Sequence, residues 1–129
     1  MLGGFRIVAS VPVTDLDQAR EFYSDKLGLK LVGDEEGESL HYEGGEGTFL
    51  EIFRTRAGVA AGHTEVGFEV DDIERVVAEM TAAGIEFEEY DLGEGMTTQG
   101  GILKTPGGNA AWFKDPEGNV LGLFESLTS

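Results

Sequence analysis

The feature that most constrains the fold of this chain is an internal repeat. The segment V-x-D-L-D-x-A at residues 13–19 recurs as V-D-D-I-E-x-V at residues 70–76, so that Val13 corresponds to Val70 and Leu16 to Ile73. Each copy follows a short apolar run and opens an amphipathic stretch, which is typical of a strand that leads into an acid-capped helix. A repeat at this spacing indicates a chain built from two copies of one module.

Both amphipathic stretches carry the pattern of helices that cover one side of a sheet. Aspartate at a helix start accepts the free N–H groups of the first turn. We therefore expect Thr14 or Asp15 to cap the first helix. Asp71 or Asp72 should cap the second. Apolar residues recur at helical spacing in both: Leu16, Ala19, Tyr23 and Leu27, then Ile73, Val76, Val77 and Met80.

Around the helices the apolar pattern changes to the alternation of half-buried strands. Each half ends in a predicted hairpin, and the two hairpins align at a larger offset than the helices do, so that Glu51 corresponds to Gly122. In the second hairpin, Asp-Pro-Glu-Gly at residues 115–118 supplies a tight turn. The additional residues of the second half fall in the glycine-rich stretch 93–108, which we expect to form a long, mobile hairpin or lid.

Each half is therefore predicted to be a β-α-β-β-β module of a single α+β domain spanning residues 1–129. Module one is expected at about 4–58 and module two at about 63–127. In each module the helix covers one side of a cup-shaped mixed sheet and leaves the other side bare. Two bare sides that face each other would enclose a cleft, either within one chain or between swapped subunits.

Composition narrows the choice of partners. The net charge of −16 argues against nucleic acid and against anionic membrane surfaces, and no apolar run approaches a membrane span. The charge favours cationic small molecules, or it is simply a solubilising surface. No cysteine is present, and no GxSxG, P-loop or GxGxxG motif occurs. We expect a cytoplasmic protein.

The arrangement, with V-x-D-L near the start and D-P-E-G-N near the end, resembles the vicinal oxygen chelate superfamily. That superfamily includes glyoxalases, bleomycin-resistance proteins and extradiol dioxygenases, and the resemblance covers about residues 5–125. It implies paired β-α-β-β-β modules in cup-shaped sheets, a small-molecule ligand and a homodimer. Because one fold hosts several chemistries, the resemblance predicts the fold more firmly than the function.

Metal-using members place four ligands on the cleft face, and the resemblance carries these positions onto Val8, Glu51, Glu65 and Gly122. Valine and glycine offer no side-chain donor, whereas a metal such as zinc takes three protein ligands in a catalytic site. Two carboxylates with water would hold magnesium or manganese only weakly. We therefore expect no catalytic metal and no other cofactor. An organic ligand or the indole of Trp112 is expected to fill the space at Gly122.

Several side chains are expected to line the cleft. The resemblance implies that Trp112 faces the cup, where it would stack on a flat or cationic ligand; alternatively, Trp112 packs in the core beneath the helix. His41 corresponds to Trp112 when the two hairpins are aligned, and it shares that face or is a structural histidine. The full predicted ligand-binding set is Trp112, His41, Phe49, Glu51, Phe53, Glu65, Phe124 and Arg6.

Glu51 and Glu65 are the candidate proton-transfer bases, because an apolar cup penalises two anions. Alternatively, they meet a ligand ammonium or Arg6, or lie solvated at the rim. Three functions stay open. The first is a metal-free binding protein for a cationic or aromatic, antibiotic-like molecule. The second is an isomerase, lyase or dioxygenase-type enzyme that uses Glu51 or Glu65, and the third is a dimeric partner of another protein.

Overall fold

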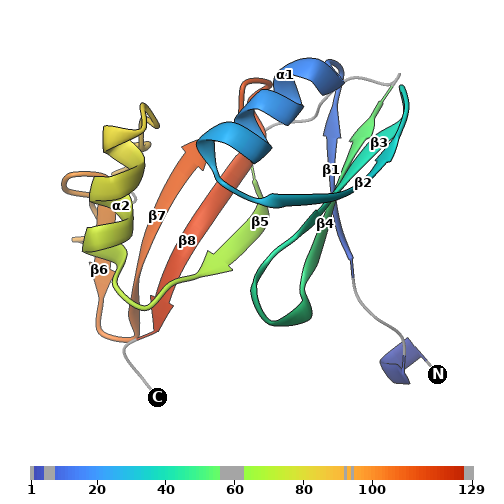
Figure 1. Cartoon of the computed structure of the whole chain (residues 1–129). Helices are drawn as coiled ribbons and strands as arrows, with labels where there is room; N and C mark the ends of the chain where they lie inside the picture. The colour runs from blue at the N-terminus through green and yellow to red at the C-terminus, as the bar shows by residue number, and fades with distance from the viewer. Residues whose placement is uncertain (1, 5–7, 56–62, 92, 94, 127–129) are drawn as a thin grey trace. The chain divides into compact units, whose positions relative to one another are not determined.

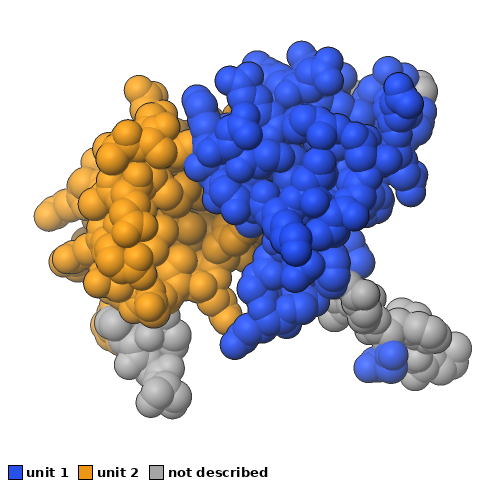
Figure 2. Space-filling model, in the orientation of Figure 1, with its two compact units in different colours: residues 1–60 blue, residues 61–129 orange. Residues whose placement is uncertain are grey.

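The computed structural model describes residues 2–4, 8–55, 63–91, 93 and 95–126. The chain divides into two compact units, Met1–Ala60 (unit 1) and Ala61–Ser129 (unit 2), shown in Figure 2. Each unit contains one four-stranded mixed sheet and one principal helical segment (Figure 1). The predicted α+β class and the β-α-β-β-β modules are confirmed. In the described residues, no helix is both long and apolar enough to cross a membrane.

Unit 1 has the strand order β1-β4-β3-β2, in which β1 and β4 run parallel and the other pairs run antiparallel. Short 3₁₀ turns lie at Leu2–Gly4 and Gly45–Gly47, and the helix continues into a π-helical segment, Glu21–Lys26. The other elements are β1 (Ala9–Val13), α1 (Leu16–Arg20), β2 (Lys30–Glu35), β3 (Ser39–Glu43) and β4 (Phe49–Arg54).

The helix of unit 1 begins at the predicted acid. Asp15 is the N-cap, and its carboxylate accepts a hydrogen bond from the Gln18 N–H at 3.0 Å. The buried residues Ala19 and Tyr23 turn toward the sheet, where the Tyr23 ring meets Tyr42 at a centroid distance of 6.1 Å. The apolar stripe therefore covers one face of this sheet, as its spacing predicted.

Unit 2 repeats the topology with the order β5-β8-β7-β6, in which β5 and β8 run parallel. Its helix α2 contacts β7 and β8 (Figure 1). The elements are β5 (Thr64–Glu69), α2 (Ile73–Ala82), β6 (Ile102–Thr105), β7 (Gly108–Lys114) and β8 (Val120–Ser126).

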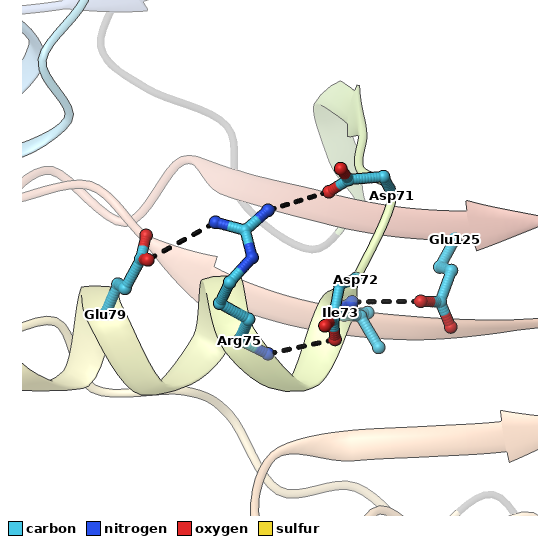
Figure 3. Close-up of polar contacts among 6 residues, drawn as sticks. All are labelled: Asp71, Asp72, Ile73, Arg75, Glu79 and Glu125. Carbon is cyan, nitrogen blue, oxygen red and sulfur yellow. Dashed lines mark hydrogen bonds and ion pairs between the residues drawn. The ribbon is translucent and has the colours of Figure 1, made fainter.

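Two carboxylates hold the start of α2, as Figure 3 shows. Asp72, the N-cap, accepts from the Arg75 N–H at 3.2 Å, and Glu125 on β8 accepts from the Ile73 N–H at 3.0 Å. Arg75 forms ion pairs with Asp71 at 2.8 Å and with Glu79 at 3.3 Å. The first turn of α2 is thus tied both to its own cap and to the last strand of the sheet.

The turn between β7 and β8 forms where Asp-Pro-Glu-Gly predicted it. Gly118 has a φ of 90°, a conformation that favours glycine. One carboxylate oxygen of the buried Asp115 accepts from the backbone N–H groups of Glu117 and Asn119, each at 2.9 Å. The other accepts from the Asn119 amide at 2.8 Å. The turn is therefore fixed by side chains as well as by its glycine.

The stretch 93–108, expected to form a hairpin or lid, contributes strand β6 to the sheet. Ile102 and Leu103 of β6 are buried, and Thr98 is buried too, with its hydroxyl accepting from the Tyr90 N–H at 2.7 Å. A hairpin is present, but it is the short connection between β6 and β7. Of the two expected alternatives, the hairpin describes residues 102–105, which pair with β7 in the sheet.

Candidate functional site

Each sheet has one face under its helix and a second face opposite the helix, here called the distal face. Along β4, Leu50 and Ile52 are buried on the helix side, which leaves Phe49, Glu51 and Phe53 on the distal face. Along β7, Ala111 and Phe113 are buried beneath α2, and Trp112 alternates to the distal face. The alternative that Trp112 packs beneath the helix is therefore excluded.

The distal face of unit 1 carries a polar cluster on three adjacent strands. Ser10, Glu51 and His41 lie in register across β1, β4 and β3. The Ser10 hydroxyl donates to one oxygen of Glu51 at 3.2 Å, and His41 Nε2 lies 3.9 Å from the other. Because the hydroxyl fixes one oxygen, the Glu51 carboxylate is oriented while remaining about one-third exposed.

His41 has further polar neighbours. Its Nε2 forms a hydrogen bond with the hydroxyl of the buried Ser39 at 3.1 Å, and it lies 3.8 Å from the Glu35 carboxylate. Phe49 and Phe53, both half-buried, flank Glu51 along β4. Together these residues form a carboxylate–imidazole pair between two aromatic side chains, which can accept or hold a proton.

The distal face of unit 2 has the same skeleton with different side chains. Gly67, Gly122 and Trp112 lie in register across β5, β8 and β7. The alignment of the two repeats makes them equivalent to three residues of unit 1, namely Ser10, Glu51 and His41. One copy of the repeat therefore presents hydroxyl, carboxylate and imidazole, and the other presents two bare backbone positions beside an indole.

The ring of Phe124 lies over the two glycines. A Cβ placed on Gly67 would come within 2.6 Å of this ring, and a Cβ placed on Gly122 within 2.8 Å. The Cδ1 atom of Trp112 would lie 3.4 Å from the Cβ of Gly122. Trp112 therefore borders the space at Gly122, but the nearest occupant is Phe124.

Three aromatic rings form a row in unit 2. Trp112 meets Tyr90 at a centroid distance of 5.6 Å and Phe124 edge-on at 6.5 Å. Beside the row lies a cavity of about 560 Å³, within the size range of ligand pockets. Its lining residues are Glu69, Val70, Leu103, Thr105, Gly107, Gly108, Asn109, Ala110, Trp112, Phe124 and Glu125.

Glu65 belongs to unit 2 and is mostly buried, with 16% of its side chain exposed. Its carboxylate lies 3.4 Å from Nε2 of His63. The structure thus places His41, Phe49, Glu51 and Phe53 in one unit and Glu65, Trp112 and Phe124 in the other. Arg6 lies outside the described residues.

Four residues near these groups were not predicted: Ser10, Ser39, His63 and Tyr90. Ser10 had a usable signal, because the repeat pairs it with Gly67 and it alternates with the residues of the core. His63 precedes Glu65 at the alternate-residue spacing of side chains on one face of a strand. No pattern pointed to Tyr90, since it reaches Trp112 from outside the strands.

The donor set does not fit a tightly held transition metal. Two of the four positions implied by the resemblance are Val8 and Gly122, which supply no side-chain donor. Glu51 is already hydrogen-bonded to Ser10. In the parts of the chain that the structure describes, no group of three His, Asp or Glu residues is arranged to hold a metal ion.

Comparison with known proteins finds relatives that share this architecture. A Vibrio parahaemolyticus protein described as a probable lactoylglutathione lyase is 26% identical, over 88% of this chain and 85% of that protein. The antibiotic-binding protein TnmS3 from Streptomyces sp. CB03234 is 26% identical, with a TM-score of 0.76 over 98% of both chains. A glyoxalase/bleomycin resistance protein from the same organism is 27% identical, with a TM-score of 0.69 over 92% of this chain and 98% of that one.

The match to a family model extends over nearly the whole chain. The model described as the Glyoxalase/Bleomycin resistance protein/Dioxygenase superfamily matches residues 6–123, which include both repeats and every distal-face residue described above except Phe124. This chain therefore belongs to the Glyoxalase/Bleomycin resistance protein/Dioxygenase superfamily.

Proposed function

We propose that this protein binds a small, antibiotic-like organic molecule that carries an aromatic group, and that it does so without a catalytic metal. The observation that supports this most is the row of Tyr90, Trp112 and Phe124 beside a cavity of about 560 Å³. A half-buried tryptophan on the distal face offers a large apolar surface for stacking. The similarity to TnmS3, an antibiotic-binding protein, supports the same class of ligand.

A cationic guest suits the charges around this cavity. Glu69 and Glu125 line it, and the net charge of −16 attracts cations over a longer range. A cation next to an indole face also gains a cation–π interaction. The Glu125 carboxylate is partly occupied, since it accepts hydrogen bonds from Ile73 and Asn109. Glu69 is therefore the better partner for a ligand ammonium.

The test is a ligand screen that uses intrinsic fluorescence, because Trp112 is the only tryptophan in the chain. Cationic and aromatic antibiotics should change the emission of Trp112, and the change should saturate at a stoichiometric ratio of ligand to protein. Calorimetry should then show that Trp112→Ala weakens binding about fivefold, since a lost aromatic contact is worth about 1 kcal/mol. Met96→Ala, which removes an exposed apolar side chain that does not line the cavity, is the control. If no compound in such a screen alters the emission, the binding proposal fails.

The polar cluster of unit 1 supports a second candidate, an isomerase or lyase of the same superfamily. Glu51 would act as the base, because the Ser10 hydroxyl orients its carboxylate and His41 lies within reach of it. The Vibrio parahaemolyticus relative is consistent with lyase chemistry. Glu65 is the other candidate base, although it is paired with His63.

The two candidates separate in one experiment. Glu51→Gln keeps the shape and the hydrogen bond from Ser10 but removes the basic oxygen. For an enzyme, turnover of a bound substrate should fall at least about a hundredfold with little change in affinity. For a binding protein, no turnover is present to lose. Glu65→Gln serves as the matched control that distinguishes the two carboxylates.

We also propose a homodimer, since members of this superfamily often form dimers. Analytical ultracentrifugation should give a mass near twice 13.8 kDa. A monomer at micromolar concentration would contradict this part of the proposal.

A further inference from the structure

We propose that Gly67 and Gly122 form a slot for one flat aromatic ring, and that Phe124 fills this slot in the free protein and leaves it when a ligand ring enters. This inference rests on the proposed binding function and adds a subsite and a residue that determines its specificity. The expected ligand carries a planar six-membered aromatic ring with no substituents or only small ones.

The slot arises because two neighbouring strands lack side chains at the same level of the sheet. Gly67 and Gly122 are register partners on β5 and β8. Neither has a positive φ, so the backbone conformation does not require glycine at either position. Their effect is to leave room above the sheet, and the Phe124 ring is in that room: a Cβ on either glycine would collide with it.

The Phe124 ring is only partly enclosed by its neighbours. It remains 38% exposed, which makes it one of the most exposed large apolar side chains of the described residues. Its partner across β7 is the small Ala110, and its aromatic contact is the edge-on one with Trp112. Phe124 also borders the cavity of about 560 Å³, so the ring has space to turn into when it leaves the glycines.

These contacts define what the slot accepts. Its floor is the flat backbone of two strands, and one wall is the edge of Trp112, so a planar ring fits and a bulky saturated group does not. Ligand rings compete with Phe124 for this place, so their apparent affinity is the intrinsic affinity multiplied by the fraction of time that the slot is open. Phe124 thereby selects for rings that stack better than its own.

The experiment measures the binding of benzene, the simplest flat ring, through the single indole N–H resonance of Trp112 in NMR titrations. Phe124→Ala should bind benzene about tenfold more tightly than the unchanged protein, because the competing ring is gone. Adding Gly122→Ala to Phe124→Ala should remove most of this gain, because the new methyl group occupies the slot. Met96→Ala, which removes another exposed apolar side chain of unit 2 that does not line the cavity, should bind benzene like the unchanged protein.

Two results would overturn the inference: equal benzene affinity in Phe124→Ala and the unchanged protein, or a gain that Gly122→Ala leaves intact. Thermal unfolding checks that each variant is folded. Should Phe124→Ala be unfolded, Phe124→Leu provides the same comparison with a smaller expected gain. These results are independent of the antibiotic screen. The benzene titrations can contradict the slot while the screen supports ligand binding, and the screen can find no ligand while the titrations support the slot.

Discussion

Tyr42 occupies the centre of the core of unit 1 with no exposed surface. Its hydroxyl shares a hydrogen bond with the Ser24 hydroxyl at 2.8 Å, and its ring packs against Tyr23. Burial raises the pKa of Tyr42 above the usual value of about 10, because a buried phenolate loses its hydration. The unfolded chain therefore loses this proton at a lower pH than the folded chain does.

The sign of the pH dependence follows. Tyr42 contributes its full stability below about pH 10, and this contribution falls as the pH rises through the raised pKa. Tyr42→Phe should cost about 1 kcal/mol at pH 7, from the lost hydrogen bond to Ser24, and should weaken the decline in alkali. Urea unfolding at pH 7 to 11 measures both effects. An unchanged alkaline slope in the variant would contradict this assignment.

At the residue scale, the sequence predicted which face a side chain takes better than what that side chain touches. Alternation placed Glu51 and Phe49 on the face opposite Leu50, because the strand period leaves only two choices, whereas the expected position of Trp112 came from the family resemblance. Alternation could not show that the ring of Phe124 folds back over Gly122. That contact depends on a side-chain rotamer, which no periodicity records.

At the scale of elements, the start of α2 allows a matched comparison of two neighbouring acids. Asp72 caps the helix, whereas Asp71 only forms an exposed ion pair with Arg75. Asp72→Ala should lower the free energy of unfolding by about 1 kcal/mol, and Asp71→Ala by less than about 0.5 kcal/mol. Chemical denaturation of both variants measures the difference. Equal losses would mean that the cap at Asp72 contributes nothing beyond its charge.

A substitution in the turn between β7 and β8 should lower the free energy of unfolding more than a substitution at the start of α2. Asp115 accepts three hydrogen bonds at a buried site, two from backbone N–H groups and one from the Asn119 amide. Asp115→Ala leaves these buried donors unpaired, so we expect a loss of about 2–3 kcal/mol in unfolding free energy. Asp115→Asn, which keeps an acceptor oxygen, should lose less. A loss as small as that of an exposed site would show that water replaces the carboxylate.

Helices and strands with a clear periodicity of apolar residues were predicted, and elements without such a periodicity were not. The two helices and their acid caps followed from apolar spacing and from the Asp-containing repeats. Strand β6 was missed because it is short and lies in a glycine-rich stretch. The π-helical segment at Glu21–Lys26 was also missed, since its residues suit an α-helix equally well.

At the scale of the whole molecule, the charge of −16 should make stability depend on salt. Acidic side chains repel one another in the compact state, and at physiological ionic strength salt screens charges beyond about 8 Å. The melting temperature should therefore rise as sodium chloride increases from about 10 mM to about 500 mM. Replacing the exposed Glu36 and Glu38 with Gln should reduce this rise. A melting temperature that falls with salt would contradict the prediction.

The whole-chain architecture was predictable because the chain repeats itself, and a repeat fixes topology without knowledge of any contact. The repeat by itself pairs His41 with Trp112 and Glu51 with Gly122. The chemistry of the two distal faces was harder to predict, because it comes from the residues at which the copies differ. Ser10 illustrates this: the repeat pairs it with Gly67, but only the structure shows its hydrogen bond to Glu51.

The difference between Ser10, Glu51 and His41 in one copy and Gly67, Gly122 and Trp112 in the other has an evolutionary consequence. These positions lie opposite the helices, so natural selection can exchange them without rebuilding the interior that keeps each copy folded. On the proposed binding function, a substitution at Trp112 would change recognition in unit 2 and leave the polar cluster of Ser10, Glu51 and His41 in unit 1 in place. The repeated fold thus allows the ligand contacts of one half to change while the scaffold of both halves is kept.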